Sequence, residues 1–343
     1  MKKEKIITII IMICISASLI FIMNHNNSNT GYSNKAFSKE GFFFDTYIRI
    51  TLYDCAENSN SSKDFQAILN ECMNICENYE LIFSPTNEDS ELYKLNHSRE
   101  YLSGGDYTLS TTLEDIIDKT ALVTTPFTSK FSIYSGNLCS LWDFNNKTIP
   151  STNDINDALN DLNNNKPTSI TLGASAKGYI TDKIVEYLKN QGIKEALIDL
   201  GGNIYALGDK YNNQSYGIGI KKPFSDSNET IIALKVSDKS VVTSGIYERY
   251  FEHNGKIYHH IIDLETGYPA DNDILSVTII ADSSFVADCY STGCVLMGKD
   301  YTLKLINEKR HEDVECIIID KNYNIYLSDG LIEKDDCITI KKD

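Results

Sequence analysis

Residues 173–179 of this 343-residue chain, Gly-Ala-Ser-Ala-Lys-Gly-Tyr, combine small residues with a hydroxyl and an amine. The segment nearly matches the Gly-x-Ser-x-Gly nucleophile elbow, with Ser175 as the nucleophile, but Lys177 replaces the last glycine. Small residues at a helix N-terminus also let an anion reach the backbone N–H groups, and Lys177 would add positive charge. The segment therefore predicts either an anion site or a plain turn into a helix.

Two side chains with oxygen atoms, Asp288 and Thr292, are four residues apart in a stretch with helical periodicity. Residues at this spacing lie on one face of a helix, so both oxygens point the same way. A carboxylate and a hydroxyl, joined by a backbone carbonyl and waters, suit a hard cation such as Mg²⁺. A solvated or capping pair has the same spacing, so the pattern alone leaves both interpretations open.

His259 and His260 are neighbours in a predicted strand, so their side chains point to opposite faces. One of them must point inward, and an inward histidine is the best acid–base group that the chain offers. The alternative is a core histidine with satisfied hydrogen bonds.

Gly201 and Gly202 follow a predicted strand, but the residues after them lack the Gly-x-Gly-x-x-Gly spacing and form a strand pattern of their own. We therefore do not expect a nicotinamide-type Rossmann site. The chain also lacks the Gly-x₄-Gly-Lys-Ser/Thr phosphate loop.

Alternating helices and strands must position these residues. Apolar spacing predicts helices at 64–80, from a capping box at Thr111 and Glu114, around 155–162, at 176–190 and at 284–297. Strands are predicted at 41–54, 169–172, 196–200 and 276–281, and a hairpin turns at Asn254-Gly255. The chain shows no repeat and no second linker, so we expect one α+β domain of mixed sheets with packed helices over residues 38–343.

The N-terminus differs from the rest of the chain. Residues 1–23 carry three lysines and one glutamate, and the run from Ile6 to Met23 is uncharged and apolar. As a helix this run would be about 27 Å long, which just fits a bilayer core. It is either an uncleaved membrane anchor, which we favour, or a secretory signal. Residues 24–37 are polar and predict a tether, with order beginning near Phe42, so the domain is expected at the extracytoplasmic face of the cell membrane.

The charge balance limits the partners. The net charge is −16, from 32 Lys and Arg against 48 Asp and Glu, which argues against nucleic acid because phosphate backbones need dense basic residues. A single phosphate-bearing ligand needs only a metal, one amine or a helix N-terminus to offset its charge. The nine cysteines show no zinc-type spacing. We expect most of them to be small buried hydrophobes, and their pairing stays open.

Several segments, taken in order, resemble the ApbE family of FAD:protein FMN transferases. They are FFFDTYIRI (42–50), FSPTNEDSELYKLN (83–96), LWDF (141–144), the stretch 172–208 with LGASAKGY and DLGGN, the stretch 241–270 with VVTSGIYERY and HHIIDLETGYPA, and the stretch 276–298 with ADSSFVADCYSTG. The resemblance covers nearly all of the chain after the tether, and it implies the fold of a single ApbE-like domain.

The resemblance also implies an activity. It is the Mg²⁺-dependent transfer of FMN from FAD, as substrate, to a Ser or Thr hydroxyl of a target protein, with release of AMP. Some relatives instead hydrolyse FAD to FMN and AMP, and a non-catalytic FAD-binding module is a further alternative. The expected acceptor is a membrane-associated electron-transfer flavoprotein, because the enzyme is itself expected on that surface.

By position, the resemblance assigns roles to particular residues. The backbone oxygen of Ala174 and the side chains of Asp288 and Thr292 would hold the metal, with Ser291 beside them. His260 would be the catalytic base. Ser175 would lose its role as a nucleophile, because the attacking hydroxyl belongs to the target protein. Contacts with FAD would fall at Phe44, Thr86, Thr171, Lys177 and Ile262.

Overall fold

The computed structural model describes residues 34–55, 64–164, 166, 168–211, 214–225, 227, 229–308, 313–335 and 337–341. Its centre is an eight-stranded sheet in which every pair of neighbours is antiparallel. In spatial order the strands are β1 (Asn34–Phe43), β2 (Thr46–Cys55), β3 (Ala196–Leu200), β4 (Asn203–Leu207), β7 (Lys239–Gly245), β10 (Ile274–Ala281), β11 (Glu315–Asp320) and β12 (Ile325–Leu327).

Two smaller sheets accompany it. A four-stranded sheet has the order β13 (Leu331–Lys334), β14 (Cys337–Ile340), β6 (Thr230–Val236) and β5 (Tyr216–Lys221). The hairpin of β8 (Tyr250–His253) and β9 (Lys256–His259) forms the third sheet. Its turn is Asn254-Gly255, as predicted, and both residues have positive φ, as a two-residue hairpin turn requires.

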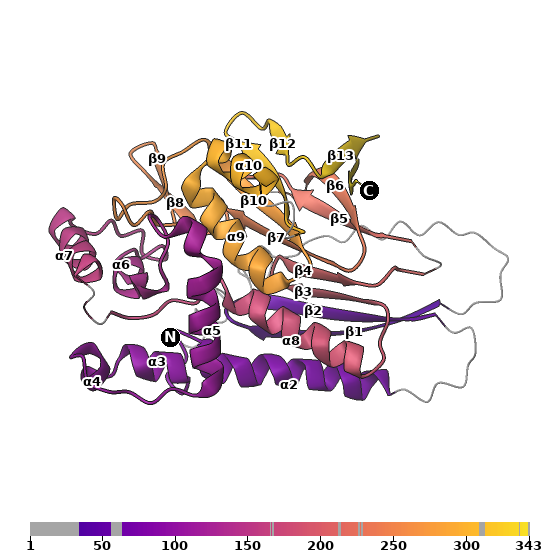
Figure 1. The fold of residues 1–343 in the computed structure, drawn as a ribbon, viewed down its shortest axis with the longest axis horizontal. Coiled ribbons are helices and arrows are strands. Elements are labelled where there is room, and N and C mark those ends of the chain that lie inside the picture. Colours follow the sequence, from indigo (N-terminus) through magenta and orange to yellow (C-terminus); the bar gives the residue numbers. More distant parts are fainter. Residues whose placement is uncertain are drawn as a thin grey trace, which may run out of the picture.

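Helices cover one face of the large sheet (Figure 1). The described helices are α2 (Phe65–Phe83), α3 (Glu91–Asn96), α4 (Arg99–Leu102), α5 (Thr111–Val123), α6 (Gly136–Ser140), α7 (Thr152–Asn163), α8 (Ala176–Asn190), α9 (Ser284–Met297) and α10 (Lys299–Glu308). Of these, α6 and α7 pack with Trp142 in a separate apolar cluster beside the sheet. Two short 3₁₀ turns, η1 (Thr125–Phe127) and η2 (Ile133–Ser135), link α5 to α6.

The large sheet separates two apolar layers. In β3, Ile198 and Leu200 pack toward the helices, whereas Leu197 packs toward the four-stranded sheet. All five residues of this strand are buried, because both of its faces are covered. The arrangement of helices, large sheet and small sheet is the α+β architecture expected from the sequence.

Most predicted elements near the site are confirmed. Helices α2, α8 and α9 occupy the segments predicted as helical, and Asp64 caps α2 by accepting a 3.0 Å hydrogen bond from the Ala67 N–H. Helix α5 begins at Thr111 as predicted, but the predicted capping residue is wrong by one position. Ser110, not Thr111, is its N-cap, because the backbone of Ser110 is extended and its Oγ accepts from the Leu113 N–H.

Two predicted strands differ from the structure. Residues 41–54 are not one strand but a hairpin, since Phe44 and Asp45 form a turn with φ of 52° and 55°. The aromatic run hides this turn in the sequence. Residues 169–172 form no strand, because a side chain provides one of their hydrogen bonds: the Ile170 N–H donates to Asn96 Oδ1 at 2.7 Å.

Strand β1 begins at Asn34, earlier than the order expected near Phe42, and so includes residues 34–37 of the predicted tether. It is an edge strand with polar outward positions, which explains why hydropathy misses it, and Phe37 anchors it by stacking on Phe65 at 4.7 Å. The predicted anchor or signal at residues 1–23 and the tether up to residue 33 lie outside the described residues. Among the residues that are described, no helix is both long and apolar enough to cross a membrane.

Candidate active site

One edge of the large sheet collects the loops that carry the predicted site. Register places Ile48 opposite Leu200, Asn203 opposite Val242, and Ser276 opposite Gly245. The β1–β2 turn, the β3–β4 turn and the end of β7 therefore lie along the same edge. The first turns of α8 and α9 also lie there, because the Asn203 Oδ1 accepts hydrogen bonds from the hydroxyls of Thr181 on α8 and Ser284 on α9.

Gly178 lets α8 and α9 approach closely. A Cβ atom at this position would lie 2.7 Å from both the Asp288 Cβ and the Phe285 Cα, and closer still to the carbonyl oxygen of Ser284. Only a residue without a side chain fits there. The small residues of segment 173–179 thus serve the packing of two helices, which brings Asp288 to the N-terminus of α8.

Asp288 is buried, with 4% of its surface exposed. Its Oδ2 accepts a 2.9 Å hydrogen bond from the Gly178 N–H and so caps the first turn of α8, for which Ser175 supplies no side-chain cap. Burial raises the pKa of Asp288, and the positive charge of Lys177, the Gly178 N–H and the Asn203 amide all oppose that rise. The site thus holds a carboxylate whose charge is only partly compensated.

Three hydroxyl groups cluster one turn further along α9 from this carboxylate. Ser244, near the end of β7, lies 2.7 Å from the Ser291 Oγ and 3.2 Å from the Thr292 Oγ1. The Ser291 hydroxyl also donates to the backbone oxygen of Asp288 at 2.9 Å, so Ser291 is held within its own helix turn. Thr292 is half-buried and lies on the same face of α9 as Asp288.

These donors fit a magnesium ion. They are all oxygens, with one carboxylate and neutral hydroxyls, and the backbone oxygen of Ala174 immediately precedes the N-cap of α8. Among the described residues, no group of three or more His, Cys, Asp or Glu side chains could hold a metal. A cation here would therefore rest on one carboxylate, neutral oxygens and the substrate, which is the usual pattern for Mg²⁺.

His260 follows strand β9 and is half-buried. Its Nδ1 lies 3.2 Å from the carbonyl oxygen of Arg249, so Nδ1 carries the proton and donates, which leaves the Nε2 lone pair free. Burial lowers the pKa of His260 to about 4, and the positive charges of Arg249 and Lys177 contribute to this. The imidazole is therefore neutral at pH 7 and able to accept a proton.

His259 is the inward histidine, with 3% exposed. Its Nε2 contacts the carbonyl oxygen of Ala270 at 3.0 Å, and its Nδ1 accepts from the Ile261 N–H at 3.3 Å. Both nitrogens are thus used in the core. The sequence left an inward histidine either as the acid–base group or as a core histidine with satisfied hydrogen bonds, and His259 is the second. His260, which the resemblance selected, has the free nitrogen.

Lys177 is the local positive charge. Besides its effect on Asp288 and His260, it opposes the rise in the pKa of Glu248 that desolvation causes. Glu248 is exposed to water, but protein atoms on its other sides are dense enough to desolvate its carboxyl. Sequence reasoning missed Glu248. Its only sequence signal was its place in the YERY segment, between the end of β7 and β8.

The other predicted contacts are more dispersed. The Phe44 N–H donates to the Glu80 Oε1 at 2.8 Å, so the β1–β2 turn is tied to the last turns of α2. Thr86 is exposed just beyond that helix, where its N–H donates to the Ser84 Oγ. Within the described residues, no hydrogen bond or ion pair joins Phe44 or Thr86 to Asp288 or His260.

Thr171, Ile262 and Ser175 occupy different surroundings. The Thr171 N–H donates to the Ile133 oxygen at 2.8 Å, which holds the loop ahead of α8. Ile262 is 6% exposed and packs in an apolar cluster with Trp142, so its side chain is not available to a ligand. Ser175 is 1% exposed and its hydroxyl points to the Leu172 oxygen, which excludes it as a nucleophile.

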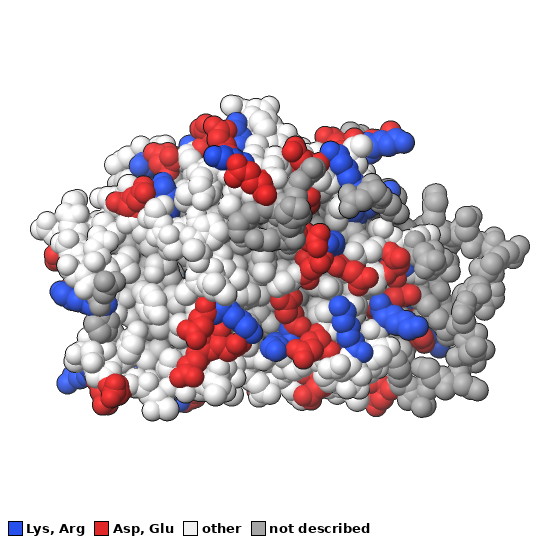
Figure 2. All heavy atoms as spheres, viewed as in Figure 1, with Lys and Arg blue, Asp and Glu red and all other residues white. Residues whose placement is uncertain are grey.

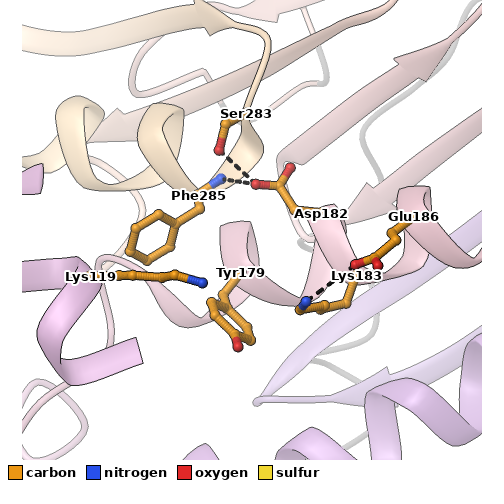
Figure 3. A pocket seen from close by; sticks show the side chains of 7 residues that line it. All are labelled: Lys119, Tyr179, Asp182, Lys183, Glu186, Ser283 and Phe285. Atoms are coloured by element: carbon orange, nitrogen blue, oxygen red, sulfur yellow. Dashed lines mark hydrogen bonds and ion pairs between the residues drawn. The ribbon is translucent and has the colours of Figure 1, made fainter. Parts of the chain in front are cut away.

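A pocket lies on the other side of the α8–α9 contact (Figure 3). It has a volume of about 220 Å³ and is lined by Lys119, Tyr179, Asp182, Lys183, Glu186, Ser283 and Phe285. Asp182 lies at the pocket and bonds to the start of α9, whereas Lys183 pairs with Glu186 at 3.2 Å. None of the residues predicted to bind FAD or metal lines this pocket, so we place the candidate active site around Lys177, His260 and Asp288 instead.

Charge on the molecular surface is mixed. On the face shown in Figure 2, Lys and Arg side chains alternate with Asp and Glu and form no continuous basic patch. On this face, a phosphate would find positive charge only from single basic side chains.

Comparisons with known proteins agree with one another. A profile of the ApbE family matches residues 44–318. The FAD:protein FMN transferase of Klebsiella pneumoniae (strain 342) is 32% identical over 312 residues, which are 86% of this chain and 92% of that protein. The FAD:protein FMN transferase of Treponema pallidum (strain Nichols) is 28% identical over 330 residues, covering 88% and 89% of the two chains.

Solved structures share the fold. The ApbE protein of Thermotoga maritima has a TM-score of 0.72 and 27% sequence identity, and the match covers 86% of this chain and 97% of that one. The flavin transferase ApbE from Vibrio cholerae has a TM-score of 0.74 at 22% identity, covering 87% and 98%. At that identity the second likeness shows the fold alone.

Proposed function

Because the chain belongs to the ApbE family, we propose that it transfers FMN from FAD to a Ser or Thr hydroxyl of an acceptor protein, in a Mg²⁺-dependent reaction that releases AMP. The chain is an enzyme of this family, since relatives named FAD:protein FMN transferase are 25–32% identical to it over most of its length. The metal, the acceptor residue and the cellular location are the parts of the proposal that go beyond this membership.

The observation that carries the proposal is the electrostatic grouping of His260, Lys177 and Asp288. The charge of Lys177 acts both on the neutral imidazole of His260, whose Nε2 is free, and on the buried carboxylate of Asp288 at the N-terminus of α8. Phosphoryl transfer needs these three properties: a proton acceptor, positive charge and a place for a cation. A serine hydrolase would need an accessible serine beside the base, which Ser175 does not provide.

Each residue then has a defined task. Lys177, at the positive end of the α8 dipole, would hold the pyrophosphate of FAD and offset its charge. Asp288, Thr292 and the Ala174 oxygen would hold Mg²⁺, with Ser291 beside them. When bound there, Mg²⁺ neutralises negative charge on the phosphate oxygens.

His260 would accept the proton of the acceptor hydroxyl at Nε2 while Arg249 fixes the ring through Nδ1. The hydroxyl oxygen forms a new bond to the phosphorus of the FMN half, and the bond from that phosphorus to the oxygen of the AMP half breaks. AMP leaves with that oxygen. Phe44, Thr86, Thr171 and the backbone of Ile262 would contact the remainder of FAD.

We further propose that residues 1–23 anchor the enzyme to the cell membrane with the catalytic domain on the extracytoplasmic face, or direct its secretion if they are cleaved. The lysines ahead of an uncharged apolar run support this proposal. An acceptor on the same surface, such as a membrane-associated electron-transfer flavoprotein, would then be within reach.

The test uses the full chain with FAD, Mg²⁺ and an acceptor protein that carries a Thr-containing flavinylation motif. Mass spectrometry of the acceptor should show the gain of one FMN and release of one AMP. Free FMN and AMP without a labelled acceptor would instead show FAD hydrolysis, and tight FAD binding without either product would show a binding module. The His260→Gln variant should label no acceptor, whereas His253→Gln, at an exposed position of the hairpin, should label as the wild type does.

A further inference from the structure

Helices α8 and α9 cap each other through two carboxylates. On one side, Asp288 of α9 accepts from the Gly178 N–H at the start of α8. On the other, Asp182 of α8 accepts from the start of α9: its Oδ1 from the Ser284 N–H at 2.7 Å, and its Oδ2 from the Phe285 N–H at 3.1 Å. Gly178 and Asp182 are four residues apart on α8, and Ser284 and Asp288 are four residues apart on α9. The bonds therefore link the starts of two antiparallel helices at two levels, which we call the Gly178 rung and the Asp182 rung.

Asp182 makes a third bond that completes the cap of α9. The Ser283 hydroxyl donates to the Asp182 Oδ2 at 2.6 Å and accepts from the Val286 N–H at 3.2 Å (Figure 3). Three backbone N–H groups of the first turn of α9 are thereby satisfied, directly by Asp182 or through Ser283. The negative charge of Asp182 at the N-terminus of α9 also interacts favourably with the dipole of that helix.

The two rungs differ in what they fix. In the Gly178 rung, α9 contributes only the Asp288 side chain, whose oxygens a cation would also use. The Asp182 rung ends on backbone N–H groups of α9, so it fixes the helix itself against α8. Since Asp288 and Thr292 lie one and two turns further along α9, the position of both depends on this backbone rung.

We propose that Asp182 is a positioning residue, which sets the register of α9 so that Asp288 and Thr292 meet the Ala174 oxygen at the cation site. This inference rests on the proposed function of that site. Asp182 lies at the pocket of Figure 3 and is not one of the metal ligands predicted from the sequence. It acts through the backbone of α9, and its negative charge also adds to the rise in the pKa of Asp288.

The experiment compares FAD binding with and without Mg²⁺, using the fluorescence of FAD and the full chain. In the wild type, Mg²⁺ should lower the Kd for FAD. Asp182→Asn keeps the shape of the side chain but removes its charge and at least one acceptor, so the effect of Mg²⁺ should shrink by about tenfold or more. The Kd for FAD without Mg²⁺ should stay within about threefold of the wild-type value, because the register of α9 does not act on FAD directly.

Matched variants separate positioning from a general loss of stability. Asp64→Ala removes the cap of α2 and should lower the thermal midpoint without changing the Mg²⁺ effect. Ser283→Ala leaves both backbone rungs in place and should retain most of the effect. Asp182→Glu keeps the charge but lengthens the reach by one methylene, so it should lose the effect much as Asp182→Asn does, and it replaces that variant if the latter fails to fold.

A folded Asp182→Asn or Asp182→Glu variant with the wild-type Mg²⁺ effect would overturn the inference. The proposed function fails in a different way, namely when the wild type itself shows no Mg²⁺ effect on FAD binding and labels no acceptor.

Discussion

Substitution of Gly178 by alanine should damage the site without replacing any group that does chemistry. The new Cβ would lie 2.7 Å from two carbon atoms of α9, where about 3.5 Å or more is the normal separation. Since the nearest atoms belong to the backbone of α9 or to the Cβ of Asp288, no side-chain rotation relieves the overlap. Helix α9 must therefore move away from α8 by roughly 1 Å.

This movement has two measurable costs. Overpacking and the lost cap on the Gly178 N–H together cost about 3 kcal/mol, of which the better helix propensity of alanine returns about 1 kcal/mol. A net destabilisation of about 2 kcal/mol would lower the thermal midpoint of a protein of this size by roughly 4 °C. A shift of about 1 Å in the Asp288 carboxylate should also reduce FMN transfer by about a hundredfold.

The assay is urea unfolding followed by the fluorescence of Trp142, together with the rate of acceptor labelling. Trp142 is the one tryptophan of the chain, and it is buried with 4% exposed. Gly217→Ala is the matched control, because a Cβ at Gly217 meets no atom within 4 Å and its φ is not positive. If Gly178→Ala were as stable and as active as Gly217→Ala, the close approach of α8 and α9 would not position the site.

Three further predictions concern the titrating and metal-binding groups. Because the pKa of His260 is lowered to about 4, kcat/KM for acceptor labelling should rise with pH through about 4 and stay flat from pH 6 to 8, and an inflection near 6.5 would contradict the assigned base. Asp288→Asn should abolish the Mg²⁺ effect on FAD binding, while Thr292→Val should weaken it by about tenfold, both measured by titration of Mg²⁺. The pKa of His259 is lowered to about 4 by burial, so the unfolded state binds more protons below pH 6.5 and stability should fall by up to about 3 kcal/mol between pH 6.5 and 4. Urea midpoints of wild type and His259→Gln test this, and an equal pH dependence in both proteins would refute it.

The sequence predicted the local elements of the site well, because their signals are local. Helical periodicity located α8 and α9 at their observed bounds, and the Asn254-Gly255 turn located the hairpin that precedes His260. The spacing of Asp288 and Thr292 placed both on one helix face. Each of these inferences depends on residues fewer than about ten positions apart.

What the sequence could not give depends on distant residues. Nothing local shows that Gly178 is needed for helix contact rather than for a turn or for a ligand, since the atoms that forbid a Cβ belong to Ser284, Phe285 and Asp288. Sequence reasoning missed Asp182 and Glu248 for the same reason, because their surroundings come from residues distant in the sequence. Strand alternation correctly set the two neighbouring histidines on opposite faces, but only the packing shows that the inward one uses both nitrogens in the core.

The net charge of −16 also changes its meaning once the site is assembled. An acidic chain would repel a dinucleotide if its charges acted as a whole, yet exposed charges are screened over about 10 Å. At the site, the buried Asp288 carboxylate faces the half-buried Lys177 amine and the Gly178 N–H at the start of α8. Because burial raises the pKa of Asp288, the ionised form is costly without a further positive charge, and a divalent cation would supply it. The acidity of the site is therefore a reason to expect metal-dependent FAD binding: removing Mg²⁺ with a chelator should weaken binding of FAD, whose pyrophosphate is anionic, more than binding of uncharged riboflavin.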